Sequence, residues 1–439
     1  MTLSGSEPTR RAAVLPALLF MAAMPLSLPN IYGAAAASAG FALLAFAAML
    51  SFFGDSRLRF LDANNAPLRI VCYCVTAAYF WPAFIAGNGI VSFEFRSAAN
   101  SLVLNAGATF LAMVVLAAPA RRRLIVQMTV LAAAVVGFSG ILTVALWKLF
   151  EPGFGLFATT SVGGRPTLEP VYLPLTTTLG VFSGLAGDLP RLVGYAREPG
   201  WMALYACVAY FLAEFVFRGK PLLVIRVGCI LAVLGTFSTA GVGIFIFTWA
   251  FKALLIPKVG SQPMAGFLRQ VAGLVAMGSA LWIWVVLPGV GLKAKSELDP
   301  YSVGQRREAT VAGWHALLHS PLGGGASEVV GGVNLIAAIA AFGLPFSLAI
   351  IAAMWLPRLR HNARSHTTAP ILAVFLTVAF SQPPGDSLWM IISVMLIYGV
   401  TQISKVPKVQ STLAGQWYSH AGRRPGDQIA TRRGGTSAL

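Results

Sequence analysis

Long runs of apolar residues recur along the whole chain, separated by shorter polar stretches. An α-helix of about 20 residues crosses the roughly 30 Å hydrocarbon core of a bilayer, so each run predicts a membrane-spanning helix. We predict about twelve spans, near residues 12–30, 33–53, 69–88, 100–119, 124–149, 201–217, 221–237, 239–257, 269–288, 334–356, 369–381 and 387–404.

Two of these runs differ from the others. The run 12–30 follows Arg10 and Arg11 and resembles a signal peptide, but further spans follow at once, which favours an uncleaved anchor. The run 369–381 is short and ends in the polar stretch 381–386, so this run is also compatible with a partly re-entrant segment.

The pattern predicts an all-α fold, a polytopic transmembrane helical bundle over residues 1–404. Two long connections, about 150–200 and 289–333, are predicted to be periplasmic loops that contain short helices. Antiparallel helices need only short connections, so long ones in a compact protein are usually functional. Residues 405–439, rich in Gly, Arg and Ser, predict a disordered basic tail in the cytoplasm.

Composition supports this class. Of the 439 residues, 57% are hydrophobic and only 11% are charged, and the mean hydropathy is +0.74. The formal net charge is +17, yet 22 Lys and Arg residues fall in one set of connections and tails and only nine in the opposite set. That asymmetry is the positive-inside signature and predicts that both termini are cytoplasmic. The basic charge is therefore an orientation signal, which argues against nucleic-acid binding.

The four cysteines all fall inside apolar runs. No set of cysteines occupies a polar loop, so the sequence predicts neither a disulfide framework nor a zinc site. Small core-filling side chains explain them better than redox chemistry does.

The first long connection ends in a charged junction, Arg191-Leu-Val-Gly-Tyr-Ala-Arg-Glu198-Pro-Gly, which leads directly into an apolar run. Arg191 and Arg197 are expected either to contact lipid headgroups and nearby carboxylates, or to hold a phosphate group through bidentate guanidinium contacts. Glu198 precedes the start of a predicted helix, where the helix dipole favours a carboxylate. The second interpretation of Glu198 is a general base beside two arginines.

The second long connection predicts a helix over about 300–319, because Asp299-Pro300 is a typical helix start and Ser320-Pro321 ends it. Arg306 and Arg307 lie near its beginning. His315 and His319 share one stripe with Glu308, which allows three interpretations: a metal site, interfacial histidines, or proton transfer by one of them. On a straight helix Arg306 points nearly opposite His315, so a site using both needs a bend.

Two further features have simpler explanations. The stretch Pro321–Ser327 is rich in glycine but is followed by no lysine, so it predicts a sharp turn rather than a phosphate loop. Glu214 and Arg226 lie near the cytoplasmic ends of consecutive spans, where mutual neutralisation is the favoured interpretation and a proton relay is the other.

Three stretches together resemble the Wzy/O-antigen ligase superfamily of bacterial polysaccharide polymerases and ligases, which are integral-membrane, GT-C-like glycosyltransferases. The first is Arg191-x-x-Gly-x-x-x-Glu198-Pro, similar to that superfamily's R-x-x-G-x-x-x-E-P signature. The second is Ser238-Thr-Ala-Gly241, similar to an S-x-S-G step. The third comprises Ser302-x-x-x-Arg306, Pro321-Leu-Gly-Gly-Gly and Val333-Asn334, followed by Ala341-Phe-Gly-Leu-Pro.

The resemblance implies a metal- and cofactor-independent glycosyltransferase of the bacterial inner membrane, with its active site facing the periplasm. Its donor would be an undecaprenyl-diphosphate-linked oligosaccharide, and its protein partners a flippase and chain-length or export proteins. Arg191 and Arg306 match the arginines that bind the diphosphate, with Arg197, Arg307 and Asn334 as further binding candidates. Glu198, His319 or His315 would accept a proton from the acceptor hydroxyl.

The chain departs from the superfamily pattern at two positions. Ala326 replaces the last glycine of P-L-x-G-x-G, and Val333 replaces the histidine that precedes the asparagine in ligases. The second departure favours a polymerase of O-antigen, capsule or exopolysaccharide over a ligase that transfers glycan to lipid A-core. A transporter or flippase of lipid-linked sugars is the alternative from another class, which charged residues at mid-membrane positions would favour.

Overall fold

The structure is a computed structural model that is mainly helical, and each of the twelve predicted apolar runs contains a helix. The predicted tail, 405–439, lies outside the described residues. The described residues are 7–27, 34–54, 59–90, 94–150, 156–161, 168–172, 178–184, 187–194, 196, 198–255, 263–286, 293, 296–297, 300–324, 333–360, 367–384 and 388–403.

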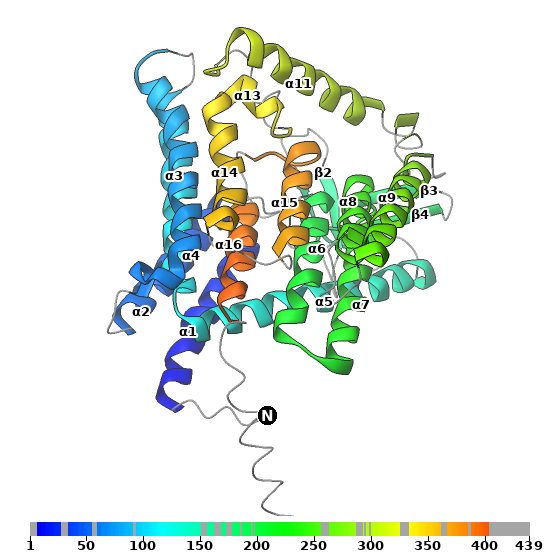
Figure 1. The fold of residues 1–439 in the computed structure, drawn as a ribbon, viewed down its shortest axis with the longest axis horizontal. Coiled ribbons are helices and arrows are strands. Elements are labelled where there is room, and N and C mark those ends of the chain that lie inside the picture. Colours follow the sequence, from blue (N-terminus) through cyan, green and yellow to red (C-terminus); the bar gives the residue numbers. More distant parts are fainter. Residues whose placement is uncertain are drawn as a thin grey trace, which may run out of the picture.

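Most helices run back and forth along roughly one direction in Figure 1, whereas α11 lies across the upper end and α5 crosses the lower half of the view. The predicted span 334–356 is divided at Gly343 into two helices. The helices are α1 (Glu7–Leu26), α2 (Ala34–Gly54), α3 (Ala66–Gly87), α4 (Phe95–Leu116), α5 (Pro119–Phe150), α6 (Pro199–Val216), α7 (Gly219–Gly235), α8 (Thr239–Ala250), α9 (Pro263–Val286), α11 (Pro300–His319), α13 (Ala337–Phe342), α14 (Leu344–Arg360), α15 (Thr368–Phe380) and α16 (Leu388–Ile403), with short turns η1 (Arg59–Leu61), η2 (Ala63–Asn65) and η3 (Phe251–Leu255).

Helix length and surface chemistry both indicate association with a membrane. Five of the described segments are long and apolar enough to cross one: Ala36–Gly54, Ala63–Gly87, Phe95–Leu116, Pro119–Phe150 and Pro199–Val216. Large apolar side chains also remain exposed on helix faces, such as Tyr73, Val135 and Phe80 at 66%, 62% and 54%. Water would make so much exposed apolar surface unfavourable, whereas acyl chains would cover it.

The connection 150–200 contains strands, where the sequence predicted short helices. Strands β1 (Leu156–Ser161), β2 (Leu168–Tyr172), β3 (Thr178–Gly184) and β4 (Gly187–Leu192) form an antiparallel sheet in the order β1-β2-β3-β4. Only two residues separate β3 from β4, and Gly184 pairs with Gly187 across this tight hairpin. Thr, Val and Phe recur in these strands, and such residues favour a pleated sheet over a helix.

Hydrogen bonds between distant segments define two ends of the bundle. Trp389 Nε1 donates to Ser27 O at 3.2 Å, joining the start of α16 to the end of α1. The hydroxyl of Tyr79, late in α3, donates to Pro384 O at the same end. The start of α1 and the end of α16 therefore lie together at the opposite end, which is the lower end in Figure 1.

Helix α6 is the central helix. Its residues from Gly200 to Ala213 are all buried, and it packs against α5, α7, α8, α15 and α16. A central helix of this kind gives its first residues, which follow the charged junction, a fixed position at the upper end of the bundle.

Two glycines allow α5 and α7 to cross in close contact. A Cβ atom on Gly137 would lie 1.9 Å from Gly228 O, and a Cβ atom on Gly228 would lie 2.8 Å from the Cα atom of Ala134. Small residues at such crossings let helices associate in lipid by close backbone packing.

We expect Gly137→Ala to destabilise the protein by about 1–3 kcal/mol, because the obstructing atoms belong to the backbone and cannot rotate away. Thermal unfolding of the purified protein in detergent measures this change. Gly278→Ala is the matched control, since no atom lies within 4 Å of a Cβ at that position of α9. Equal unfolding temperatures for the two variants would contradict the crossing.

Candidate functional site

The charged junction forms the start of α6. Arg191 lies in β4 and its Nε–H donates to Thr236 O at 3.5 Å. Gly194 has a φ of +57°, a left-handed conformation that favours glycine, and a Cβ there would lie 2.8 Å from Met202 Sδ. These contacts bend the chain from the sheet into α6.

Glu198 is the N-cap residue of α6, as the sequence predicted. Its carbonyl accepts a hydrogen bond from the Trp201 amide at 3.1 Å. Its side chain accepts no capping hydrogen bond from the helix. Both interpretations of Glu198, a carboxylate favoured by the helix dipole and a general base, therefore stay open.

The second motif lies beside the first. Ser238 caps α8 by accepting a hydrogen bond from the Gly241 amide at 3.2 Å. A Cβ on Gly241 would lie 2.4 Å from the Cβ of Ala203 in α6, so this glycine lets α8 start against α6. Because Arg191 donates to Thr236, two residues before Ser238, the two motifs lie next to each other.

The turn after α15 covers the first residues of α6. The Gln382 side chain is 2% exposed, and a Cβ on Gly200 would lie 2.0 Å from its Nε2. Among the described residues, Gln382 Oε1 and Trp201 Nε1 are buried without a hydrogen-bond partner. The polar stretch that follows the run 369–381 thus contributes a buried side chain that packs against the start of α6.

We expect Gly200→Ala to lower the stability by about 1–2 kcal/mol, because the added methyl group displaces a buried amide. The double variant Gly200→Ala/Gln382→Ala should recover part of that loss. Thermal unfolding of the two single variants and the double variant gives their coupling energy. Strict additivity would show that Gln382 does not pack on Gly200 as described.

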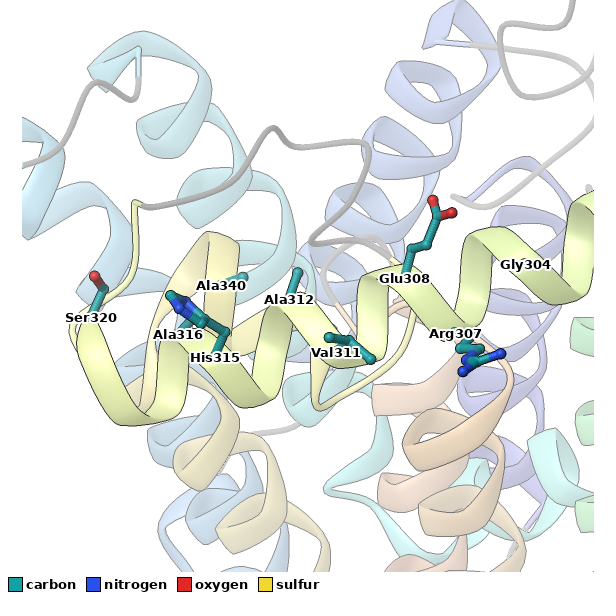
Figure 2. A pocket seen from close by; sticks show the side chains of 9 residues that line it. All are labelled: Gly304, Arg307, Glu308, Val311, Ala312, His315, Ala316, Ser320 and Ala340. Carbon is teal, nitrogen blue, oxygen red and sulfur yellow. The ribbon is translucent and has the colours of Figure 1, made fainter.

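The second part of the candidate site is α11, shown in Figure 2. A groove of about 750 Å³ runs along this helix and is lined by Gly304, Arg307, Glu308, Val311, Ala312, His315, Ala316, Ser320 and Ala340. Ala340 belongs to α13 and all other lining residues lie on or next to α11. The groove combines a cation, a carboxylate, an imidazole and a hydroxyl with an apolar floor, which suits a polar ligand with an apolar portion.

The candidate residues of α11 point to different sides of this helix. Helix α11 is continuous from Pro300 to His319, so Arg306 and His315 point to opposite sides and do not share a site. Arg307, not Arg306, lines the groove. The packing of α11 is mainly on α13, whereas β4 packs on β3, α5, α6 and α7. Arg191 and Arg306 therefore lie on elements that pack against different neighbours. Their convergence on one diphosphate stays a prediction.

The predicted histidine stripe is present. The ring centroids of His315 and His319 lie 4.4 Å apart, and both side chains are exposed. Within the described residues, no group of three or more His, Cys, Asp or Glu side chains is arranged to hold a metal ion. Interfacial histidines and proton transfer by His315, which faces the groove, are the interpretations that the geometry favours.

Asn334 is a structural anchor. Its Nδ2 donates to Thr310 Oγ1 of α11 at 2.9 Å, and its Oδ1 accepts from the Ala337 amide at 2.8 Å. The side chain is 4% exposed. Asn334 therefore holds α11 on the start of α13, and substrate binding by this amide remains an untested expectation.

The glycines of the third motif group meet in space. Gly323 and Gly343 have φ values of +96° and +85°, and a Cβ on Gly323 would lie 2.6 Å from Gly343 N. The Leu344 amide also donates to Pro321 O at 2.8 Å. As predicted, the glycine-rich stretch makes a sharp turn. This turn packs the end of α11 against the start of α14.

The end of α15 joins the two parts of the site. The Leu335 amide, beside Asn334, donates to Val378 O at 2.9 Å. Four residues later, Gln382 packs on Gly200. The start of α6 and the α11–α13 unit are thus held at the same end of the bundle by one helix terminus.

Sequence reasoning missed Gln382 and Thr236 as neighbours of the charged junction. The only signal for Gln382 was a polar residue at the end of an apolar run, which does not reveal its contact. The predicted candidate Arg197 lies outside the described residues.

Comparisons with known proteins complete this description. No protein-family model matches the chain, and no sufficiently similar sequence was found among curated proteins.

Proposed function

We propose that the protein is a polysaccharide polymerase of the bacterial inner membrane that acts on undecaprenyl-diphosphate-linked glycans at its periplasmic face. The observation that carries the proposal is the presence of two polar sites at one end of an apolar bundle, at the start of α6 and along α11. The residue resemblance described above points to the same chemistry.

Two separate basic positions suit a polymerase in particular. Its donor and its acceptor are both lipid-linked and both carry a diphosphate, so it needs two cationic sites. Arg191 would hold the donor diphosphate beside α6, and Arg307 would hold that of the incoming repeat unit in the α11 groove. A ligase acceptor such as lipid A-core does not require a second diphosphate site.

In the proposed reaction, a hydroxyl oxygen of the acceptor sugar attacks the anomeric carbon of the donor glycan. The bond from that carbon to the diphosphate oxygen breaks, and undecaprenyl diphosphate leaves. Arg191 stabilises the negative charge that develops on the leaving group. Glu198 accepts the proton of the attacking hydroxyl, with His315 as the second candidate.

The direct test is incubation of the purified protein with a purified lipid-linked repeat unit. We expect a ladder of products that differ by one repeat unit. Transfer only to added lipid A-core would identify a ligase instead. Movement of the repeat unit across a vesicle membrane without any extension would identify a flippase and overturn the proposal.

We expect Arg307→Ala to raise KM for the acceptor unit about tenfold, because a charge-assisted contact of about 1.5 kcal/mol is lost. Arg306→Ala is the matched control, since Arg306 lies outside the groove lining, and its effect should be less than about twofold. Initial rates of extension at varied acceptor concentration measure both values. A larger effect at Arg306 would remove the groove from the acceptor site.

A further inference from the structure

A cluster of three charged side chains lies toward the lower end of α6, α7 and α8, far from the candidate site. Glu214 Oε2 lies 2.7 Å from an Arg226 terminal nitrogen, and Glu214 Oε1 lies 2.6 Å from Lys252 Nζ. The pairing of Glu214 with Arg226 confirms the neutralisation predicted from the sequence. Lys252, in the turn η3 that follows α8, is a third member.

The cluster carries one positive charge in excess, since two cations share one carboxylate. In the described part of the chain, Glu214 is the only carboxylate that pairs with either cation. The three side chains are only 21–27% exposed, and Arg226 Nε is buried with no hydrogen-bond partner. Partly buried cations without a balancing anion are unfavourable, so the cluster has the capacity for one more anionic group.

The surroundings suit a phospholipid. The guanidinium of Arg226 lies 4.9 Å from the centroid of the Tyr210 ring. The neighbouring face of α7 exposes Leu223, Val224 and Val227 by 66%, 56% and 41%, which provides an apolar surface for acyl chains. Helix α7 lies at the periphery of the bundle in Figure 1, with the α6–α7 turn at the lower end.

We propose that Arg226 and Lys252 bind the phosphate of an anionic phospholipid whose acyl chains lie along α7. Basic pockets between helices near a bilayer surface are typical sites for such headgroups. The proposal does not depend on the glycosyltransferase function, because the cluster shares no residue with the candidate site.

The test is thermal unfolding of the full chain in detergent, titrated separately with phosphatidylglycerol, phosphatidylcholine and inorganic phosphate. We expect phosphatidylglycerol to raise the unfolding temperature in a saturable way and the other two to have little effect. Native mass spectrometry should show one retained anionic lipid. An equal rise with phosphatidylcholine, or the full rise with inorganic phosphate alone, would overturn the proposal.

Variants of the cluster show which residues bind phosphatidylglycerol. Lys252→Gln leaves Glu214 paired with Arg226 and should weaken phosphatidylglycerol binding about tenfold, the loss of one charge-assisted contact. Lys220→Gln removes the same charge from an exposed position of the adjacent turn and should change binding less than about twofold. Glu214→Gln increases the excess charge and should strengthen binding. Equal effects of Lys252→Gln and Lys220→Gln, or weaker binding in Glu214→Gln, would contradict the site.

Discussion

Replacing Arg191 by alanine should lower the rate of glycan extension by about 10²–10³-fold, the loss that follows removal of one donor to a developing negative charge. Arg191 lies in β4 and its Nε–H donates to Thr236 O, so the guanidinium is held against the α7–α8 connection. Arg191→Lys should recover only part of the rate, because an ammonium cannot reproduce bidentate contacts. Extension assays with the purified variants measure these rates.

The control for this prediction is Arg96→Ala. Arg96 is an exposed arginine near the start of α4, and the same loss of charge there should leave extension unchanged. Unfolding temperatures of all variants must be compared, since Arg191 also joins β4 to the α7–α8 connection. If Arg191→Ala unfolds at the normal temperature and extends glycans at the normal rate, the proposed donor site is wrong.

The helical segments were predictable because one strong signal defines them. A run of about 20 apolar residues has few other stable structures in a bilayer, where every backbone polar group needs an internal partner. The same signal does not show where a helix is interrupted within a hydrophobic run. The corner at Gly343 interrupts such a run, and its cause is the distant turn at Gly323, which packs against it.

The sheet in 156–192 was not predicted, for a different reason. Length and mixed polarity identified this connection as a functional loop, but its short strands have no long periodic pattern. Their pairing depends on tight turns such as the one between Gly184 and Gly187. Strand pairs of this kind are determined by contacts between segments rather than by the composition of one segment.

The site was predictable only at the level of single residues. Local chemistry identified Arg191, Glu198 and the α11 histidines, because charges are rare in this chain. The grouping of Arg191 and Arg306 at one diphosphate came from the resemblance and stays a prediction, since the two arginines lie on elements with different neighbours. Gln382 became visible only through its contact with Gly200, which depends on packing between α6 and α15.

Replacement of Arg122 is expected to have the largest effect on stability. Its side chain is 1% exposed, and its nitrogens donate to Leu116 O at 2.7 Å, Gly399 O at 3.1 Å and Ala117 O at 3.1 Å. It also donates to Asn65 Oδ1. One guanidinium thus satisfies carbonyls at the ends of α4 and α16, where the helix dipoles favour a cation.

We expect Arg122→Met to destabilise the protein by several kcal/mol, because the buried acceptors lose their donor at about 1–3 kcal/mol each. Arg123→Met is a stringent control, since it removes the same positive charge from the next, less buried position. If arginines here served only to orient the chain in the membrane, the two variants would behave alike. Thermal unfolding of both proteins, together with the membrane orientation of each, separates the two roles: a large fall in unfolding temperature for Arg122→Met alone, with orientation unchanged, shows that this arginine holds α4 and α16 together.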